Sequence, residues 1–311
     1  MYRILTDEDI SKTLTMKHAI NAIELSLKAK NEGKLIAPPR FSVGLKNGSL
    51  IFTVGADTKN SNAIGFRVYD SFESDSPDRT QLVAVFDSRS GAFRGIVMGV
   101  LIGALRTAAI NALAIRYMAR SDAKCLGVLG SGLQARTHAR AAAVVRNFER
   151  ASVYSPTDKN RQAFARELND KTGIPTRALS SAKDVVREAD VLICATNSRK
   201  PVLDAGWLRP GTHINTIGPK IKGANELPIE VARKSNYIVT DSLQQVDEYK
   251  SYSTPFFLHD TPERRRMVEL DELVVGKSIG RSSSDELTLF CSVGLAGTEI
   301  ILADEALQQL E

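Results

Sequence analysis

Residues 125–135 read CLGVLGSGLQA and carry the strongest structural signal in this chain. An apolar run leads directly into two glycines, and a segment with helical spacing follows over 133–147. In such a turn Gly130 permits the tight bend, Gly132 lets backbone N–H groups approach a pyrophosphate, and small Ala135 allows the helix to pack closely on the strand. The phosphates would lie at the N-terminus of the helix. The stretch therefore predicts a dinucleotide-binding turn, with a merely tight strand-helix connection as the alternative.

Strands and helices alternate on the C-terminal side of this turn. The predicted strands are 151–154, 176–178, 191–195, 213–217 and 237–240, and the predicted helices are 159–171 and 182–188. Such alternation is typical of parallel strands joined by crossover helices. We therefore predict a Rossmann-type α/β domain with a doubly wound parallel sheet over residues 119–292.

The residues before the turn follow a different pattern. A short strand is predicted at 2–5, and Thr6 and Thr15 can cap two successive helices. Five short strands follow at 40–43, 50–54, 63–69, 81–87 and 92–97, separated by turns that include 74–78. Helical spacing returns over 293–310. The sequence predicts a second, α+β domain built from both chain ends, residues 1–118 and 293–311.

Composition excludes several classes of protein. The 311 residues are 43% hydrophobic, and the formal net charge is +5. The basic residues are scattered among 36 acidic ones and form no continuous basic stripe that would bind a nucleic acid. The three cysteines have no pair spacing and lie in apolar surroundings, which predicts reduced core thiols and a cytoplasmic protein. The four histidines have no spacing typical of metal ligands, so no metal site is expected. The N-terminus is acidic where a secretory signal would be basic.

Residues 96–115 are apolar enough to suggest a membrane span, but Arg106, Thr107 and Asn111 interrupt them. A central arginine costs about 2.5–3.5 kcal/mol on membrane-insertion scales. We therefore predict a strand followed by a buried helix, and no membrane association. An arginine in such a setting needs a partner, so Arg106 is a candidate site residue, with a buried structural ion pair as the alternative.

The choice of cofactor depends on the end of the strand at 151–154. Proteins that bind NAD usually place an acidic residue there to bond the ribose 2′-hydroxyl, and this chain has none. Ser155, Thr157 and Arg161 instead suit a 2′-phosphate, which favours NADP over NAD, although Arg161 and Lys159 can equally be solvated residues of the first helical turn. Thr196 and Gly218 each follow a later strand and are expected to line the same crevice.

Several motifs together resemble one known family. They are Pro38-Pro39-Arg40, Leu105-Arg106-Thr107-Ala108-Ala109, the turn at 130–135, the run 210–218, Glu226-Leu227 and Ser292-Val293-Gly294-Leu295-Ala296. This combination resembles the ornithine cyclodeaminase and mu-crystallin family over nearly the whole chain. The resemblance implies an NAD(P)-binding Rossmann domain joined to a split substrate domain that dimerises through its sheet. It also implies hydride transfer at the carbon–nitrogen bond of an amino or imino acid.

The resemblance also implies roles for individual residues. Arg40 and Arg106 match two arginines that hold the substrate carboxylate, and a bidentate guanidinium suits that task. Arg67 stands where members such as the cyclodeaminase have a lysine, so it is counted among both the substrate-binding and the catalytic residues. The residues expected to bind the cofactor are Thr107, Gly130, Ser131, Gly132, Leu133, Gln134, Ser155, Thr157, Arg161, Thr196 and Gly218.

The chain departs from the family pattern at Lys220. Family members with cyclodeaminase or alanine dehydrogenase activity place an aspartate two residues after the glycine that matches Gly218, and the cyclodeaminase uses it on the distal amine of ornithine. A lysine would repel an ammonium group, so ornithine is not the expected substrate. If Lys220 joins Arg40, Arg67 and Arg106, the cluster favours a second acidic group or a lysine proton donor. The alternative is a surface lysine on a loop that bends away.

Three functions follow from these residues. The first is an NAD(P)(H)-dependent oxidoreductase that acts on an amino acid, a cyclic imino acid or a ketimine, with Lys220 and Arg67 as catalytic residues. The second is a dinucleotide-binding protein that binds a small anion without turnover, as the resemblance to mu-crystallin allows. The third is a true ornithine cyclodeaminase. The expected assembly is a homodimer.

Overall fold

The computed structural model describes residues 3–72, 80–252 and 254–309 and divides the chain into two compact units. The first unit comprises residues 1–106 and 294–311, and the second comprises residues 107–293. The boundary at which the first unit gives way to the second falls inside helix α3 (Leu101–Met118). The sequence predicts this boundary at the end of that helix. Periodicity marks the whole helix as one element, so it could not place the boundary within it.

The first unit is built on a seven-stranded sheet in the order β1-β7-β6-β5-β4-β2, with β3 paired to β4. Its strands are β1 (Arg3–Leu5), β2 (Leu35–Ile36), β3 (Phe41–Leu45), β4 (Gly48–Asp57), β5 (Ala63–Asp70), β6 (Leu82–Asp87) and β7 (Phe93–Met98). The hairpins from β3 to β7 are antiparallel, and β1 adds parallel to β7. All five predicted hairpin strands therefore exist, while the predicted turn at 74–78 lies outside the described residues.

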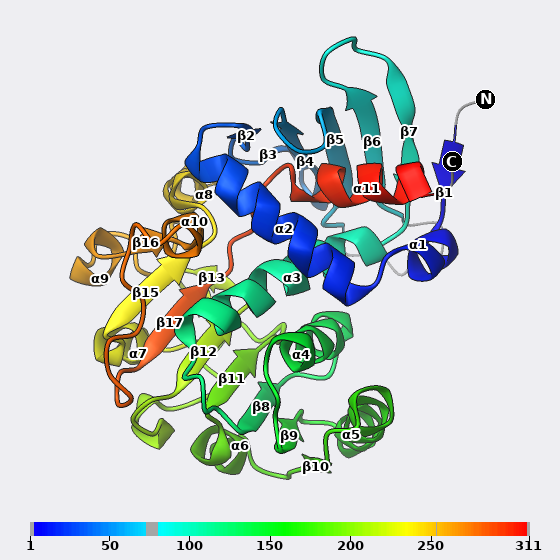
Figure 1. The fold of residues 1–311 in the computed structure, drawn as a ribbon. Coiled ribbons are helices and arrows are strands. Elements are labelled where there is room, and N and C mark those ends of the chain that lie inside the picture. The colour runs from blue at the N-terminus through cyan, green and yellow to red at the C-terminus, as the bar shows by residue number, and fades with distance from the viewer. Residues whose placement is uncertain (1–2, 73–79, 253, 310–311) are drawn as a thin grey trace. The chain divides into compact units, whose positions relative to one another are not determined.

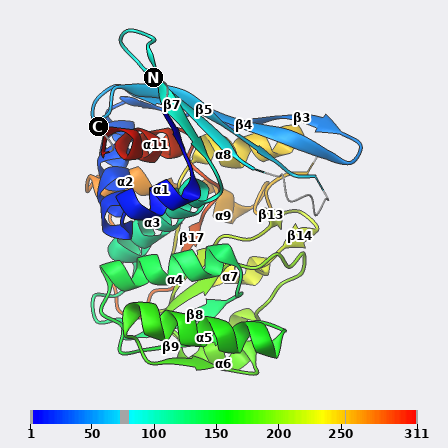
Figure 2. The same cartoon turned by 90° about the vertical axis from the view of Figure 1, so that its right-hand side faces the viewer.

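Among the described residues, three helices belong wholly to this unit: α1 (Asp7–Thr13), α2 (Met16–Asn31) and α11 (Thr298–Gln309). The hydroxyl groups of Thr6 and Thr15 accept the capping hydrogen bonds of α1 and α2, as predicted. Figure 2 shows α2 and α11 on the same face of the sheet, and α11 packs on β5, β6 and β7. The C-terminal segment thus completes the unit that the N-terminal segment begins.

The second unit holds an eight-stranded, fully parallel sheet in the order β10-β9-β8-β11-β12-β17-β15-β16. Its strands are β8 (Cys125–Leu129), β9 (Arg150–Tyr154), β10 (Thr176–Ala178), β11 (Val191–Cys194), β12 (His213–Thr216), β15 (Tyr237–Thr240), β16 (Val268–Glu269) and β17 (Thr288–Cys291). The helices between them are α4 (Leu133–Val145), α5 (Asp158–Thr172), α6 (Ala182–Glu188), α7 (Ile229–Lys234), α8 (Leu243–Glu248), α9 (Pro262–Arg265) and α10 (Leu270–Val274). The sheet reverses its winding between β8 and β11 (Figure 1), which confirms the predicted doubly wound fold.

Strand β17, which inserts between β12 and β15, is not predicted by the sequence pattern. All four of its residues are buried, so it shows no alternation of polar and apolar residues. A buried four-residue run cannot be told from helix by periodicity. Its place in the sheet depends on pairing with two strands that precede it by many residues.

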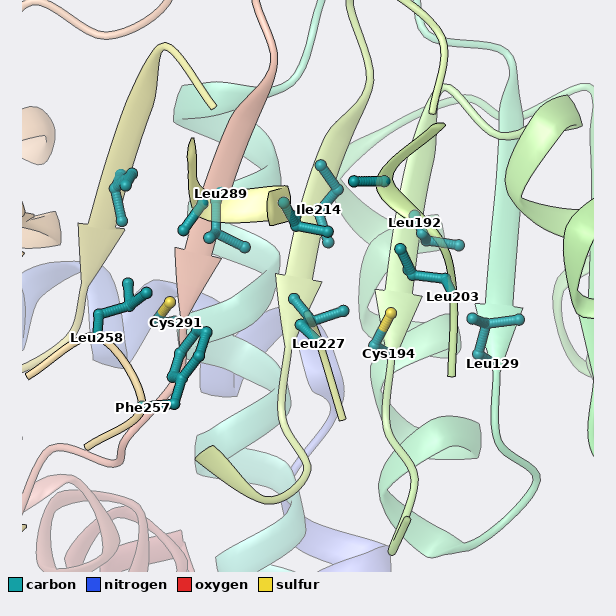
Figure 3. Packing of buried hydrophobic residues seen from close by; sticks show 14 of the residues in the cluster. Leu129, Leu192, Cys194, Leu203, Ile214, Leu227, Phe257, Leu258, Leu289 and Cys291 are labelled. Atoms are coloured by element: carbon teal, nitrogen blue, oxygen red, sulfur yellow. The ribbon is translucent and has the colours of Figure 1, made fainter. Parts of the chain in front are cut away.

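Two hydrophobic cores cover the two faces of this sheet. Along β11, Val191 and Ile193 pack in one core and Leu192 and Cys194 in the other, because successive side chains of a strand point to opposite faces. Figure 3 shows the second core, where Leu192, Ile214 and Leu289 of neighbouring strands meet residues of the following loops. Burial on both faces explains why these strands read as continuous apolar runs. No helix in the described part of the chain is long and apolar enough to cross a membrane.

Candidate functional site

The glycine turn has the geometry that its sequence predicts. Gly130 has a φ of +115°, and a Cβ at this position would lie 2.3 Å from the carbonyl oxygen of Ala195, so only glycine fits. Gly132 is the N-cap of α4, and no side chain caps this helix end. A Cβ on Gly132 would meet no atom within 4 Å. No side chain therefore occupies the N-terminus of α4, which leaves this helix end available to an anion.

This helix end opens into a cleft of about 720 Å³ in the second unit. The lining includes nine residues predicted to bind the cofactor: Gly130, Ser131, Gly132, Leu133, Gln134, Ser155, Thr157, Thr196 and Gly218. Among the described residues, the Oε1 atom of Gln134 is buried without a hydrogen-bond partner. No acidic residue lies in the first turn of α4. A large cleft, an uncapped helix end and an unsatisfied acceptor fit a dinucleotide.

Two residues that are predicted to bind the cofactor are not part of the lining of this cleft. Arg161 does not line the cleft; its guanidinium donates to the carbonyl oxygens of Ser155 and Pro156 and pairs with Asp158 at 2.8 Å. These bonds hold the turn after β9, while Nε of Arg161 is, among the described residues, buried without a hydrogen-bond partner. Thr107 does not line the cleft either, and its carbonyl oxygen accepts a hydrogen bond from Asn111 on the next turn of α3.

A buried carboxyl group joins the turns after β11 and β12. Glu226 has no exposed surface, and its Oε2 accepts hydrogen bonds from the backbone N–H and hydroxyl of Thr196. Its Oε1 accepts from the Thr216 hydroxyl and from the N–H groups of Ile217 and Gly218. The sequence analysis noted Glu226 only as part of the family motif. The neighbouring residues include Lys222, Asn225 and Glu230, so the local sequence gives no signal that Glu226 is buried or which groups it bonds.

Lys220 is buried in the second unit. It lies in strand β13 (Lys220–Ile221), which pairs with β14 (Ala224–Asn225), and only 5% of its surface is exposed. Its Nζ donates to the carbonyl oxygen of Gly218 at 2.5 Å, so the ammonium group lies next to a residue of the cleft. The alternative of a solvated surface lysine is therefore wrong.

The first unit gathers predicted substrate residues around one carboxylate. The Oε1 atom of Glu299 lies 2.9 Å from Nη1 of Arg67 and 3.0 Å from Nη2 of Arg106. The other Nη of Arg67 donates to Gln81. Within the described residues, Nε and Nη1 of Arg106 are buried without hydrogen-bond partners. Two charge-bearing donors of Arg106 are thus left for a ligand.

The guanidinium groups of Arg40 and Arg106 both lie close to Gly294. Gly294 has a φ of +94°, and a Cβ there would lie 3.2 Å from Nη1 of Arg106 and 3.6 Å from Nη1 of Arg40. The two predicted carboxylate-binding arginines therefore converge beside this backbone. Gly103 likewise leaves space for an arginine, because a Cβ at that position would lie 2.5 Å from the Arg67 guanidinium. Both glycines make room for arginine side chains.

Charge and burial act against each other in this cluster. Burial opposes ionisation of Glu299, but Arg106 and Arg67 outweigh it, so the pKa of this carboxyl group lies below its usual value. Burial lowers the pKa of Arg67, with Glu299 opposing the change and Arg106 adding to it. Glu299 and Gln81 were missed by the sequence analysis, because neither is near the arginines in sequence.

The described residues contain no group of three histidine, cysteine or acidic side chains placed to hold a metal ion. Cys125, Cys194 and Cys291 are free and buried. Burial raises the pKa of the Cys291 thiol to about 12, so it stays protonated at neutral pH. These cysteines are part of the core and not of the site.

Comparisons with known proteins agree with this geometry. A Δ1-pyrroline-2-carboxylate reductase of Bacillus cereus is 28% identical, with 98% of this chain and 97% of the relative covered. The solved structure of the Thermococcus litoralis Δ1-pyrroline-2-carboxylate reductase with NADH and L-proline is 33% identical, covers 98% of this chain and 96% of its own, and superposes with a TM-score of 0.88. An archaeal alanine dehydrogenase dimer with bound NAD is 27% identical, covers 99% and 95% of the two chains, and has a TM-score of 0.87.

The family model for the ornithine cyclodeaminase/mu-crystallin family matches residues 2–306. This range includes the glycine turn with its cleft in one unit and the Glu299 cluster in the other. The chain belongs to the ornithine cyclodeaminase/mu-crystallin family.

Proposed function

We propose that this chain is an NAD(P)(H)-dependent oxidoreductase that acts on the carbon–nitrogen bond of an amino acid or of a cyclic imino acid. In the reducing direction an imino acid, NAD(P)H and a proton give the amino acid and NAD(P)⁺. When bound in the cleft, the cofactor supplies or accepts the hydride. The observation that carries the proposal is the Arg67–Glu299–Arg106 cluster, with two buried donors of Arg106 left over.

The charges of this cluster suit an anionic substrate. The two guanidinium groups of Arg67 and Arg106 face the single carboxylate of Glu299, so two positive charges and one negative charge leave one positive charge. A substrate α-carboxylate would counter that charge and accept a hydrogen bond from a free donor of Arg106. Arg40 converges on the same guanidinium and extends the clamp. Such a clamp holds the carboxylate of a bound substrate in one orientation.

Substrate screening tests the proposal directly. The purified protein is incubated with NADH or NADPH and with Δ1-pyrroline-2-carboxylate, Δ1-piperideine-2-carboxylate, or pyruvate plus an amine. Loss of the absorbance of the reduced nicotinamide supports the proposal. Tight cofactor binding without oxidation of either cofactor would favour a binding protein. Ornithine-dependent release of ammonia with formation of proline would contradict the exclusion of ornithine.

We further propose that Lys220 delivers the proton to the substrate nitrogen. Lys220→Arg keeps a cation and a hydrogen-bond donor for the Gly218 carbonyl, but a guanidinium does not release its proton in the ordinary pH range. We expect Lys220→Arg to lower kcat for imine reduction by about 100-fold or more, which is the usual contribution of a general acid. Lys220→Met should lower it equally. The measurement is kcat against pH for both variants and the wild type.

This result separates proton transfer from support of the Gly218 turn. If Lys220 only holds the Gly218 carbonyl, arginine should restore most of the activity that methionine removes. Near wild-type kcat in Lys220→Arg would therefore contradict the proton-donor role. Lys222→Arg is the matched control, because Lys222 is exposed and pairs with Asp260 at the surface; its kcat should not change.

The cleft also supports a preference for NADP(H). Ser155, Thr157 and Asn160 line it after β9, and none of them carries a negative charge that would repel a 2′-phosphate. We expect the wild type to bind NADPH more tightly than NADH. Thr157→Asp should raise the Kd for NADPH at least tenfold and change the Kd for NADH little, because only NADPH carries the 2′-phosphate. Nucleotide fluorescence titrations measure both constants.

The matched control for this titration is Asn169→Asp. Asn169 is exposed on the last turns of the same helix, α5, so the variant adds the same charge away from the cleft. Its two Kd values should equal those of the wild type. A wild type that binds NADH more tightly than NADPH would contradict the preference.

The uncovered face of the first unit supports a homodimer. Strand register places Val54 beside Phe66 and Ile64 beside Phe86 on one face of the sheet, and Ile64 is 45% exposed. Apolar side chains surround a hollow of about 490 Å³ there. A contiguous apolar surface of this kind is typical of a protein interface, and the similar archaeal alanine dehydrogenase is a dimer. Light scattering should give twice the chain mass; a monomer at micromolar concentration would contradict this proposal.

A further inference from the structure

Glu226 makes an unusual number of contacts for a carboxyl group in the second unit. It accepts five hydrogen bonds of 2.6–3.0 Å, two of them on Oε2 from Thr196 and three on Oε1 from residues 216–218. Three of the five donors are backbone N–H groups. A carboxylate offers about four lone-pair positions, so these donors fill its acceptor capacity. One side chain thus fixes the backbone of two separate turns.

The backbone of Glu226 is tied to the same two segments. Its N–H donates to the carbonyl oxygen of Pro219 at 3.0 Å, and its carbonyl oxygen accepts from the N–H of Val202 at 2.9 Å. A Cβ on Gly218 would lie 2.3 Å from Glu226 Oε2 and 2.4 Å from the carbonyl oxygen of Thr196. The two turns therefore approach so closely that only glycine fits between them.

These turns line one half of the cleft. Thr196, Val202 and Gly218 belong to its lining and follow strands β11 and β12, on one side of the point where the sheet reverses. The turn after β9, with Ser155 and Thr157, lies on the other side of that point. In doubly wound sheets each half binds one mononucleotide of a dinucleotide, and the turn after the second strand holds the adenosine ribose. The turns at Thr196 and Gly218 therefore belong to the nicotinamide half.

We propose that Glu226 is a positioning residue that fixes the nicotinamide half of the cleft by joining the turns after β11 and β12. This inference rests on the proposed dinucleotide function. Glu226 lies behind the lining and acts through Thr196 and Gly218. The adenosine half, formed by the glycine turn and the turn after β9, does not depend on it.

The substitution Glu226→Gln tests this because it keeps the size of the side chain and changes its hydrogen bonding. An amide has one acceptor oxygen, and its NH₂ group can only donate. If the oxygen stays with the three donors at residues 216–218, the NH₂ group faces the Thr196 N–H, and two donors oppose each other. The opposite orientation places the NH₂ group against the N–H groups of Ile217 and Gly218. One of the two turns must move in either case.

The experiment compares whole cofactors with their adenosine fragments. The Kd values of NADH and ADP, and of NADPH and 2′,5′-ADP, are measured by calorimetry on the full-length wild type and on Glu226→Gln. We expect the Kd of the dinucleotides to rise at least tenfold and the Kd of the fragments to stay within twofold. A merely structural role would weaken whole cofactors and fragments alike. Equal weakening, or no change in any Kd, would overturn the inference.

Asp190→Asn is the matched control. Asp190 accepts hydrogen bonds from the N–H groups of Lys124 and Cys125, so it also ties two backbone segments together, but at the opposite, amino end of β8 and β11. This variant should leave all four Kd values unchanged. If dinucleotide affinity falls as much in Asp190→Asn as in Glu226→Gln, general destabilisation explains the result and the inference is overturned.

A second variant decides the question if Glu226→Gln does not fold. Thr216→Val removes one hydroxyl donor from Oε1 without a change of shape, and Thr216 is buried and does not line the cleft. We expect a twofold to fivefold rise in the dinucleotide Kd with unchanged fragment Kd; identical Kd values throughout would overturn the inference. A wild type that binds dinucleotides but reduces no imino acid refutes the proposed reaction alone. A wild type that binds no dinucleotide refutes both.

Discussion

Replacement of Arg106 by lysine is expected to lower kcat/KM for the imino acid substrate by at least about 100-fold, the effect of truncating one partner of a buried charge pair. Lysine keeps the positive charge beside Glu299 but cannot present two parallel N–H donors to a carboxylate. The loss should fall on kcat/KM for substrate. The Kd of the cofactor should not change, because every residue that lines the cleft belongs to the second unit.

Arg94→Lys is the matched control for Arg106→Lys. Arg94 lies in the same unit and pairs with Asp304 and Asp87 at 2.6 Å. The hydrogen bonds and ion pairs of its guanidinium all go to groups outside the Glu299 cluster. This variant should lose stability and keep its kcat/KM. A wild-type kcat/KM in Arg106→Lys would refute the proposed carboxylate clamp, and an equal loss in both variants would attribute the effect to the fold.

Replacement of Glu299 by glutamine is expected to lower the free energy of unfolding by about 3–5 kcal/mol, the usual result of removing one partner of a buried ion pair. The carboxylate faces Arg67 and Arg106, and all three side chains are at least nine-tenths buried. Without the negative charge, two guanidinium groups would repel each other in a poorly solvated site. Urea unfolding at a fixed protein concentration measures the difference, because dimerisation would make stability depend on concentration.

The pH dependence of this difference distinguishes the ion pair from simple packing. The pKa of Glu299 in the folded chain lies below its usual value of 4.5, which it has in the unfolded chain. The folded state therefore binds the proton less readily, so the carboxylate contributes its full stability above pH 4.5 and loses it as the pH falls toward the lowered pKa. The difference in the free energy of unfolding between wild type and Glu299→Gln should be constant near neutral pH and shrink below pH 4.5.

The exposed Glu8→Gln variant serves as the control for this titration. Glu8 pairs with Lys12 on the surface of α1, where ion pairs contribute little. Its stability should match the wild type at every pH. If the difference in the free energy of unfolding between wild type and Glu299→Gln does not change with pH, the Glu299 side chain stabilises the fold through its shape and not through its charge.

Short-range patterns in the sequence predicted much of this molecule. The run CLGVLGSGLQA required a strand, a glycine turn and a helix because Gly130 needs a backbone conformation that other residues avoid and Ala135 needs close packing. The caps Thr6 and Thr15 predicted helix starts because capping involves residues only three apart. Arg106 was singled out because a charge in an apolar helix must have a partner.

Residues whose partners are distant in the sequence could not be predicted in this way. The four-residue strand β17 is defined by its neighbours β12 and β15 and not by its own pattern. Arg161 donates to carbonyl oxygens of the turn after β9, a contact that the sequence did not predict, and its predicted role toward a 2′-phosphate stays a prediction.

The sequence by itself determined the class of fold and the dinucleotide turn and singled out Arg106, because each rests on local chemistry or on one charge in an apolar segment, whereas Arg40 and Arg67 were predicted only through the family resemblance. Only the tertiary structure decided which groups stabilise that chemistry. Glu299 meets Arg67 across 232 residues of chain, and Glu226 meets Thr196 across 30. Such contacts depend on where the folded backbone brings distant segments together, and nothing in the local sequence encodes the identity of the partner.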